Sequence, residues 1–370
     1  MSTKLETKKD GGEIKSSGST LAKREQRLAY TLLLPTLLII AVIAFYPLGQ
    51  VFYTSMTDKT FASSEKTSFV GFENYRKLLG MKIKKLPPVI DEETGEQKID
   101  PDTGKKEYKL PIRVLPRRPV RYREVFQFGF FGQRFVVGAR DADFIESIWN
   151  TLVFTVCSVI LETILGLIIA LAMNTNFRGR GVMRATMLVP WAVITVVSAR
   201  IWEFMLQPSR MGFINMVFEK IGLSDGFMVF LGNETLSLPT MIAIDVWKTT
   251  PFMALLILAG LQLIPNSLYE AARVDGAGPL RRFFNITLPL LKPSLAVALV
   301  FRTLDALRVF DVFQVLLAQK GYSMATYNYY QLINNRAMGL ASAIGVIIFI
   351  IIFVFNCVFF CGSIYEDVGS

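Results

Sequence analysis

The chain has 370 residues, of which 52% are hydrophobic, and it carries a formal net charge of +10 with no histidine. Several apolar runs of about 20 or more residues predict an all-α polytopic membrane protein. The missing histidine excludes His-dependent acid–base chemistry and His-ligated metals. Because the basic residues lie in loops between apolar runs, they indicate membrane topology rather than nucleic-acid binding. Cys157, Cys357 and Cys361 lie in apolar runs and predict neither a disulfide framework nor a metal site.

The chain order of polar and apolar segments predicts six transmembrane helices. Residues 1–27 are polar and basic, which indicates a disordered cytoplasmic tail. The first helix is expected in 28–56, because its apolar run is too long for a signal-peptide core and has no cleavage site. A five-helix core is expected in 147–361, followed by a cytoplasmic tail at 362–370. Its helices are predicted at 147–172, 182–206, 239–262, 290–318 and 341–361.

The distribution of arginine supports this topology. With the N-terminus in the cytoplasm, the loops at 173–181 and 263–289 are cytoplasmic, and both are rich in arginine. The loops at 207–238 and 319–340 are poorer in basic residues and fall outside. We therefore expect a multi-pass protein of the cell membrane with both termini in the cytoplasm.

The loop at 57–146 departs from the positive-inside rule, by which basic residues collect in cytoplasmic loops. It contains 18 Lys and Arg against 14 Asp and Glu, yet it is expected outside. Long loops cross the membrane largely regardless of charge. Turn signals separate short alternating stretches within it, which predicts a small β-rich external insertion at about 80–140. A linker without structure of its own is the alternative.

Ionisable residues inside the predicted spans are costly in lipid and should face the interior of the helix bundle. Four pairs have i,i+3 spacing, one on the third span, one on the fourth and two on the fifth, so their members are expected to neutralise each other. The charged residues in question are Glu162, Arg200, Glu203, Asp245, Lys248, Arg302, Asp305, Arg308 and Asp311. Two interpretations stay open: these residues lock helices together, or they line a solute path. The candidate path comprises Asp245, Trp247, Lys248, Arg302, Asp305, Arg308 and Asp311.

The cytoplasmic stretch Glu270–Pro293 is predicted to be an ordered protrusion. A short helix ends at Gly276 and Gly278, and Pro279 favours the start of a second, amphipathic helix. Its spacing resembles the EAA loop of permease subunits of ABC importers. The matching residues are Glu270, Ala271, Ala272, Gly276, Ile286, Leu288 and Pro289. Stretches such as VGFENYRKLL and RVFDVFQVL are similar to the carbohydrate-uptake branch, near the first permease subunit of maltose and glycerol-phosphate importers; 80–140 lies outside this resemblance.

The resemblance implies the fold of a binding-protein-dependent ABC permease with six transmembrane helices. It implies that the loop docks on a cytoplasmic ATPase dimer, and that Asp275, which directly precedes Gly276, takes part in this contact. It further implies a second permease subunit, an extracytoplasmic solute-binding protein and a sugar substrate. The chain has no GxxxxGKS/T phosphate loop, so ATP and Mg²⁺ are expected in the partner ATPase, and no cofactor, metal site or catalytic residue is expected here.

The function predicted from these features is a permease subunit for a sugar, with a di- or oligosaccharide as the expected solute. One alternative is a secondary transporter driven by an ion gradient, which the intramembrane acids would suit. Another is an ABC permease for a different solute, such as glycerol phosphate, another anion or a polyamine. A membrane enzyme is disfavoured, because no convergent nucleophile is visible.

Overall fold

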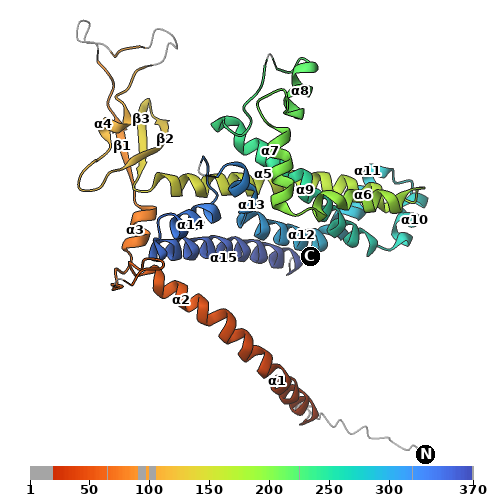
Figure 1. The fold of residues 1–370 in the computed structure, drawn as a ribbon. Helices are drawn as coiled ribbons and strands as arrows, with labels where there is room; N and C mark the ends of the chain where they lie inside the picture. Colours follow the sequence, from red (N-terminus) through yellow and green to blue (C-terminus); the bar gives the residue numbers. More distant parts are fainter. Residues whose placement is uncertain are drawn as a thin grey trace, which may run out of the picture. The chain divides into compact units, whose positions relative to one another are not determined.

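The computed structural model describes residues 20–64, 66–90, 97–99, 106–224, 226–318 and 320–368. The chain divides into two units, Met1–Tyr53 and Thr54–Ser370. Residues 1–19 of the predicted N-terminal tail and the last two residues of the predicted C-terminal tail lie outside the described residues. The order of elements along the chain is shown in Figure 1.

The first unit is dominated by one apolar helix. Helix α1 (Thr20–Ile40) continues through the π-helical turn η1 (Ala41–Phe45) into α2 (Tyr46–Ser55). The apolar stretch Lys23–Ser55 is 33 residues long, enough to cross a bilayer. Its large apolar side chains are exposed, as expected for a helix whose surface contacts lipid.

The second unit begins with the predicted β-rich insertion. It contains α3 (Glu73–Leu79), β1 (Met81–Leu86), α4 (Pro111–Val114), β2 (Arg123–Phe130) and β3 (Gln133–Ala139). The strands form an antiparallel sheet of order β1-β3-β2, which confirms the prediction of a small β-rich segment. Phe131 and Gly132 join β2 to β3 with φ of 47° and 72°, the left-handed values that a two-residue hairpin turn requires.

One face of this sheet has its own small core. Leu86 and Val136 pack there against Leu115, which lies just after α4. Gly138 lies opposite Leu115, and a Cβ at this position would come within 2.5 Å of the leucine side chain. The segment around α4 therefore covers this face of the sheet.

The helical core follows directly. Its long helices are α5 (Ala142–Asn174), α9 (Glu234–Gln262), α12 (Leu288–Leu307) and α15 (Met338–Val368). Shorter helices are α6 (Arg180–Ala192), α7 (Thr195–Met205), α8 (Phe213–Lys220), α13 (Asp311–Leu316) and α14 (Met324–Ile333). Among the described residues of the whole chain, five helices are long and apolar enough to cross a membrane, or six if α6 and α7 together form one span. The prediction of six spans is confirmed in that form.

The span predicted at 182–206 is bent in the structure. Helices α6 and α7 meet at an angle of 88°. Pro190 lies near the end of α6, where it removes a backbone donor and disfavours continuation of the helix. The chain therefore turns at Val193 and Ile194 instead of crossing as one helix.

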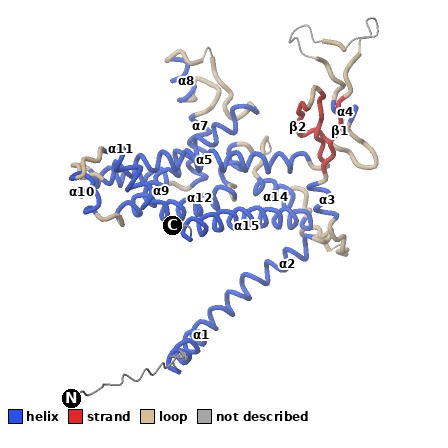
Figure 2. The backbone as a smooth tube through the Cα atoms, turned by 180° about the vertical axis from the view of Figure 1, so that it is seen from behind, coloured by secondary structure: helices blue, strands red, loops and turns tan. Residues whose placement is uncertain are grey.

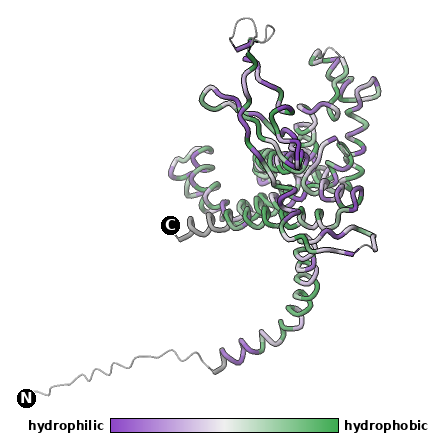
Figure 3. Tube along the Cα trace, turned by 90° about the vertical axis from the view of Figure 1, so that its left-hand side faces the viewer, coloured by the Kyte–Doolittle hydropathy of each residue, from purple (hydrophilic) through white to green (hydrophobic). Residues whose placement is uncertain are grey.

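Close contacts between the long helices build the core. A Cβ at Gly166 of α5 would lie 3.1 Å from the backbone nitrogen of Ala254 on α9, so a small residue permits this approach. Phe154 of α5 packs against Phe313 of α13 with ring centroids 5.4 Å apart. Figure 2 shows the long helices of the core side by side, and Figure 3 shows that hydrophobic residues are concentrated along the helices.

Candidate functional site

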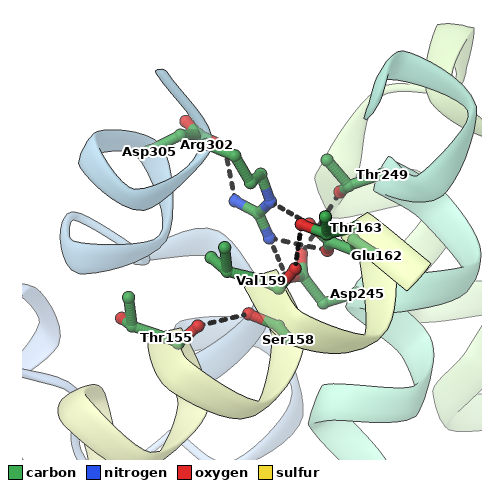
Figure 4. A network of polar contacts seen from close by, with 9 residues as sticks. All are labelled: Thr155, Ser158, Val159, Glu162, Thr163, Asp245, Thr249, Arg302 and Asp305. Carbon is green, nitrogen blue, oxygen red and sulfur yellow. Dashed lines mark hydrogen bonds and ion pairs between the residues drawn. The ribbon is translucent and has the colours of Figure 1, made fainter. Parts of the chain in front are cut away.

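An ion cluster joins three helices in the middle of the core (Figure 4). Arg302 of α12 donates through Nε and Nη2 to the two carboxylate oxygens of Glu162 on α5, with 2.9 Å between Nη2 and Oε1. Nη2 also donates to Asp245 of α9, and Nη1 donates to Asp305 at 3.0 Å. Arg302 is 2% exposed and Glu162 is fully buried. The cluster ties α5, α9 and α12 together through charge-assisted hydrogen bonds.

Asp245 was expected to pair with Lys248 on the same helix, and this expectation is wrong. Asp245 pairs across helices with Arg302, while Lys248 Nζ donates to the carbonyl oxygens of Val193 at 2.7 Å and Trp191 at 3.4 Å. These carbonyls lie at the end of α6, where a helix leaves acceptors unsatisfied. Lys248 therefore stabilises the bend between α6 and α7.

Of the other three i,i+3 pairs, Arg302 and Asp305 form the expected ion pair at 3.0 Å. Arg200 and Glu203 form the expected ion pair on α7 at 2.7 Å, as an exposed contact. The four charges of the fifth span do not share one helix, because α12 ends at Leu307 and α13 begins at Asp311. Within this break, the carbonyl oxygen of Val309 accepts a hydrogen bond from Ser323 Oγ at 2.7 Å.

A cavity of about 250 Å³ lies beside the ion cluster and the break at 308–310. Of the seven residues predicted for the solute path, six line it: Asp245, Lys248, Arg302, Asp305, Arg308 and Asp311. Trp247 does not line it; its ring contacts Trp202 edge-on at 5.4 Å. The sequence interpretation missed Trp191, which lines the cavity and stacks on Phe252 with centroids 5.5 Å apart. Its position at the end of a proline-containing helix was the available signal.

The EAA-like loop forms an exposed structure at the end of the helical core that lies away from the sheet (Figures 1 and 2). Helix α10 (Asn266–Val274) carries Glu270, Ala271 and Ala272. Asp275 ends this helix, and Gly276 has a φ of +76°, the left-handed conformation that favours glycine. A Cβ at Gly276 would have no neighbour within 4 Å, so the space beside it is open.

The second half of the loop merges with the next span. Helix α11 (Pro279–Arg282) starts at Pro279, as expected, and continues through the π-helical turn η2 (Phe283–Thr287) into α12. Ile286 lies in η2, and Leu288 and Pro289 begin α12. Tyr269 of α10 hydrogen-bonds to Thr287 with 3.0 Å between their hydroxyl oxygens, which ties the two halves of the loop together.

A groove of about 890 Å³ adjoins α10. Glu270 and Arg273 line it from α10, and Asn174 and Asn176 line it from the end of α5 and the following turn. The groove and the exposed face of α10 together offer a concave and a convex surface at the same end of the core.

Comparison with known proteins agrees with this architecture. Residues 162–361 match the family described as binding-protein-dependent transport system inner membrane component. The chain is 37% identical to the trehalose/maltose transport system permease protein MalF of Thermococcus litoralis, over 92% of this chain and 95% of that protein. It is 30% identical to the trehalose transport system permease protein SugA of Mycobacterium tuberculosis, over 94% and 91%.

The fold is also similar to solved structures. A chain of a bacterial alginate ABC transporter, solved in complex with an alginate pentasaccharide-bound periplasmic protein, aligns with a TM-score of 0.64 over 92% of this chain and 96% of that chain. The identity is 22%, so this likeness concerns the fold. With a family match over more than half of its length and relatives aligned over nine-tenths of it, the chain belongs to the binding-protein-dependent transport system inner membrane components.

Proposed function

We propose that this chain is a permease subunit of an ATP-driven importer for a neutral di- or oligosaccharide. It would work with a second permease subunit, an ATPase dimer at the cytoplasmic face and an extracytoplasmic solute-binding protein. The family membership and the relatives named for trehalose and maltose transport support the assignment. ATP and Mg²⁺ would bind to the ATPase subunits, since the chain itself has no phosphate-loop motif.

The observation that carries this proposal is the continuous helical segment from Pro279 to Leu307. Its first residues belong to the exposed EAA-like loop, and Arg302, near its other end, belongs to the ion cluster. A helix rises 1.5 Å per residue, so the segment links the loop to the cavity over roughly 40 Å. A movement imposed on α10 by the ATPase would reach the cavity through this segment and reorient the core between its two openings.

The charges of the cavity support a neutral solute. Three carboxylates and three cationic groups line it, so it has no excess of positive charge for an anion. Arg302, the obvious candidate for anion recognition, is nearly fully buried and is held by Glu162, Asp245 and Asp305. Aromatic rings of Trp191, Phe154 and Phe310 also line the cavity, and such rings suit the apolar faces of sugar rings.

The coupling role can be tested in proteoliposomes that contain the complete transporter. Gly276→Ala strains the left-handed backbone, whereas Gly276→Asn adds a Cβ but tolerates this conformation better. We expect uptake of labelled trehalose or maltose to fall at least tenfold with Gly276→Ala and with Glu270→Gln, and to be partly restored with Gly276→Asn. Hydrolysis of ATP should then respond less to the loaded binding protein. Ser267→Ala, on the same exposed helix but outside the motif, is the control.

The same assay tests the solute class. Neutral disaccharides should be transported and acidic oligosaccharides of similar length should not. Normal transport by both Glu270→Gln and Gly276→Ala would contradict the coupling role. Uptake by this chain alone, driven by an ion gradient, would contradict the ATP-driven mechanism.

A further inference from the structure

The basic excess of residues 57–146 has no role in the transport scheme above. Part of it is gathered around a cavity of about 280 Å³ between α3, the sheet and the segment after α4. This volume is close to the lower end of the range of about 300–1,000 Å³ for small-molecule pockets. We propose that this cavity binds an anionic phosphate group, with the headgroup of a membrane lipid as the source that its position favours.

The charge of the cavity favours an anion. Four cationic side chains line it, from Arg76, Lys82, Arg118 and Arg140, and Glu73 is the one carboxylate among its lining residues. Phosphate oxygens accept several hydrogen bonds at once, and Arg and Lys are the side chains that usually bind them. A single carboxylate compensates only a fraction of this positive charge.

Two of the four cationic groups, those of Arg140 and Lys82, are oriented by contacts within the protein. Arg140 donates from Nη2 to Glu73 at 3.2 Å and from Nη1 to the carbonyl oxygen of Arg76 at 3.5 Å. Gly80 makes room for it, because a Cβ there would lie 2.7 Å from the Arg140 side chain. Lys82 Nζ lies 5.0 Å from the ring centroid of Tyr122, a cation–π contact that orients it.

The cavity lies at the depth of lipid headgroups. Arg140 is separated from the start of α5 by one residue, and α5 has 33 residues, a length of roughly 50 Å. A bilayer is about 30 Å thick in its hydrocarbon core and about 40–45 Å with its polar layers. A helix of this length spans the whole bilayer with its polar layers, so its ends reach the membrane surface. Leu78 of α3 packs in one cluster with Phe144, in the first turn of α5.

The direction of the strands keeps the insertion near this level. Strands β2 and β3 run across the axis of α5 instead of continuing it away from the core (Figures 1 and 2). Lipid phosphates are thus available beside the cavity, which would anchor the insertion to the outer surface of the membrane.

The test compares two double variants of the full-length chain with equal loss of charge. The first double variant, Lys82→Gln with Arg118→Gln, removes two cations that line the cavity. The control, Lys84→Gln with Lys109→Gln, removes two exposed cations of the same insertion that do not line the cavity. The purified proteins are titrated with phosphatidylglycerol or phosphatidylcholine, and retained lipids are counted by native mass spectrometry. A basic residue near the surface contributes about fivefold to binding of an anionic lipid, so we expect roughly thirtyfold weaker retention of phosphatidylglycerol in the cavity variant and little change in the control.

Inorganic phosphate distinguishes the two sources. Retention of phosphatidylglycerol in excess inorganic phosphate assigns the site to lipid. Binding of inorganic phosphate by itself, lost in the cavity variant, assigns it to free phosphate. The proposal is overturned if both double variants lose lipid equally, or if the wild type binds neither inorganic phosphate nor phosphatidylglycerol in preference to phosphatidylcholine. Equal thermal unfolding midpoints of the two variants show that folding is not the cause.

Discussion

Arg302 on α12 donates to both carboxylate oxygens of Glu162 on α5, although the two residues are 140 positions apart in the chain. Asp245 on α9 accepts a further hydrogen bond from the same guanidinium. The charges in the middle of the spans thus satisfy each other across three helices. This arrangement favours the interpretation that Arg302 and Glu162 lock helices, whereas Asp305, Arg308 and Asp311 remain exposed beside the cavity.

Removal of Glu162 should destabilise the core. In Glu162→Ala the buried guanidinium loses two of its hydrogen bonds, and breaking a buried pair in this way costs about 3–5 kcal/mol. At roughly 2–4 °C per kcal/mol, the thermal unfolding midpoint of the purified protein should fall by about 6–20 °C. Asp305→Ala is the control, because its side chain is 72% exposed and exposed pairs contribute at most about 1 kcal/mol. Equal shifts in the two variants would contradict the locking role.

Lys248→Met should loosen the bend between α6 and α7. The substitution leaves the carbonyl oxygens of Trp191 and Val193 without their charged donor, at a cost of about 1.5–3 kcal/mol. A cysteine introduced at Thr195, which lines the cavity, should then react faster with a maleimide than it does in the wild-type background. Lys220→Met on α8 is the control. An unchanged reaction rate at this cysteine would show that the bend does not depend on Lys248.

Trp191→Ala should weaken the interaction with sugar. Trp191 lines the cavity and stacks on Phe252, and an aromatic contact of this kind contributes about 0.5–1.5 kcal/mol. In the reconstituted transporter we expect KM for the transported sugar to rise roughly two- to tenfold, with partial recovery in Trp191→Phe. Trp149→Ala, an exposed position on α5, should leave KM unchanged. An equal change of KM in both alanine variants would contradict a role of Trp191 in sugar binding.

Tyr327→Phe should change how the stability of the core depends on pH, through Asp141 at the start of α5. The Tyr327 hydroxyl donates to the Asp141 carboxylate, 2.7 Å from each oxygen, and Asp141 also caps α5. Burial raises the pKa of Asp141 above its usual value, while the hydrogen bond from Tyr327 opposes this shift. Loss of the hydroxyl should therefore raise the pKa of Asp141 further.

The direction of the pH effect follows from this shift. A carboxyl group with a raised pKa in the folded state favours folding when protonated, and that contribution is lost as pH rises through the folded pKa. Tyr327→Phe should thus be destabilised by about 1–3 kcal/mol at neutral pH, and the difference from wild type should shrink on acidification. Thermal unfolding across pH measures this, with Tyr329→Phe on the same helix as the control. A difference that grows toward low pH would contradict the assignment.

Local patterns in the sequence were enough to predict the main elements. The apolar runs predicted the spans, because a membrane requires long stretches without charge whatever their neighbours are. The glycine and proline at positions 276 and 279 predicted the break in the EAA-like loop, because backbone conformation there depends on residue type. Family membership followed from the same loop, and the comparisons confirm it.

The partners of the intramembrane charges could not be predicted in this way. The i,i+3 spacing pointed from Asp245 to Lys248, yet Asp245 pairs with Arg302 and Lys248 with two backbone carbonyls of α6. Spacing describes only neighbours on one helix, while a buried charge takes whichever group the packing of other helices brings to it. The bend at Val193 and the break near Arg308 likewise receive hydrogen bonds from distant segments, from Lys248 and Ser323.

The sequence by itself determined the membrane class, the number of spans, the β-rich insertion and the exposed loop with its EAA-like spacing, because these depend on local hydropathy and backbone preference. Only the tertiary structure decided which charges lock helices and which line the cavity with Trp191. It also brought Arg76, Lys82, Arg118 and Arg140 together around the second cavity. The physical reason is that the electrostatic energy of a group in a low-dielectric interior depends on its neighbours in space, and these come from distant parts of the chain.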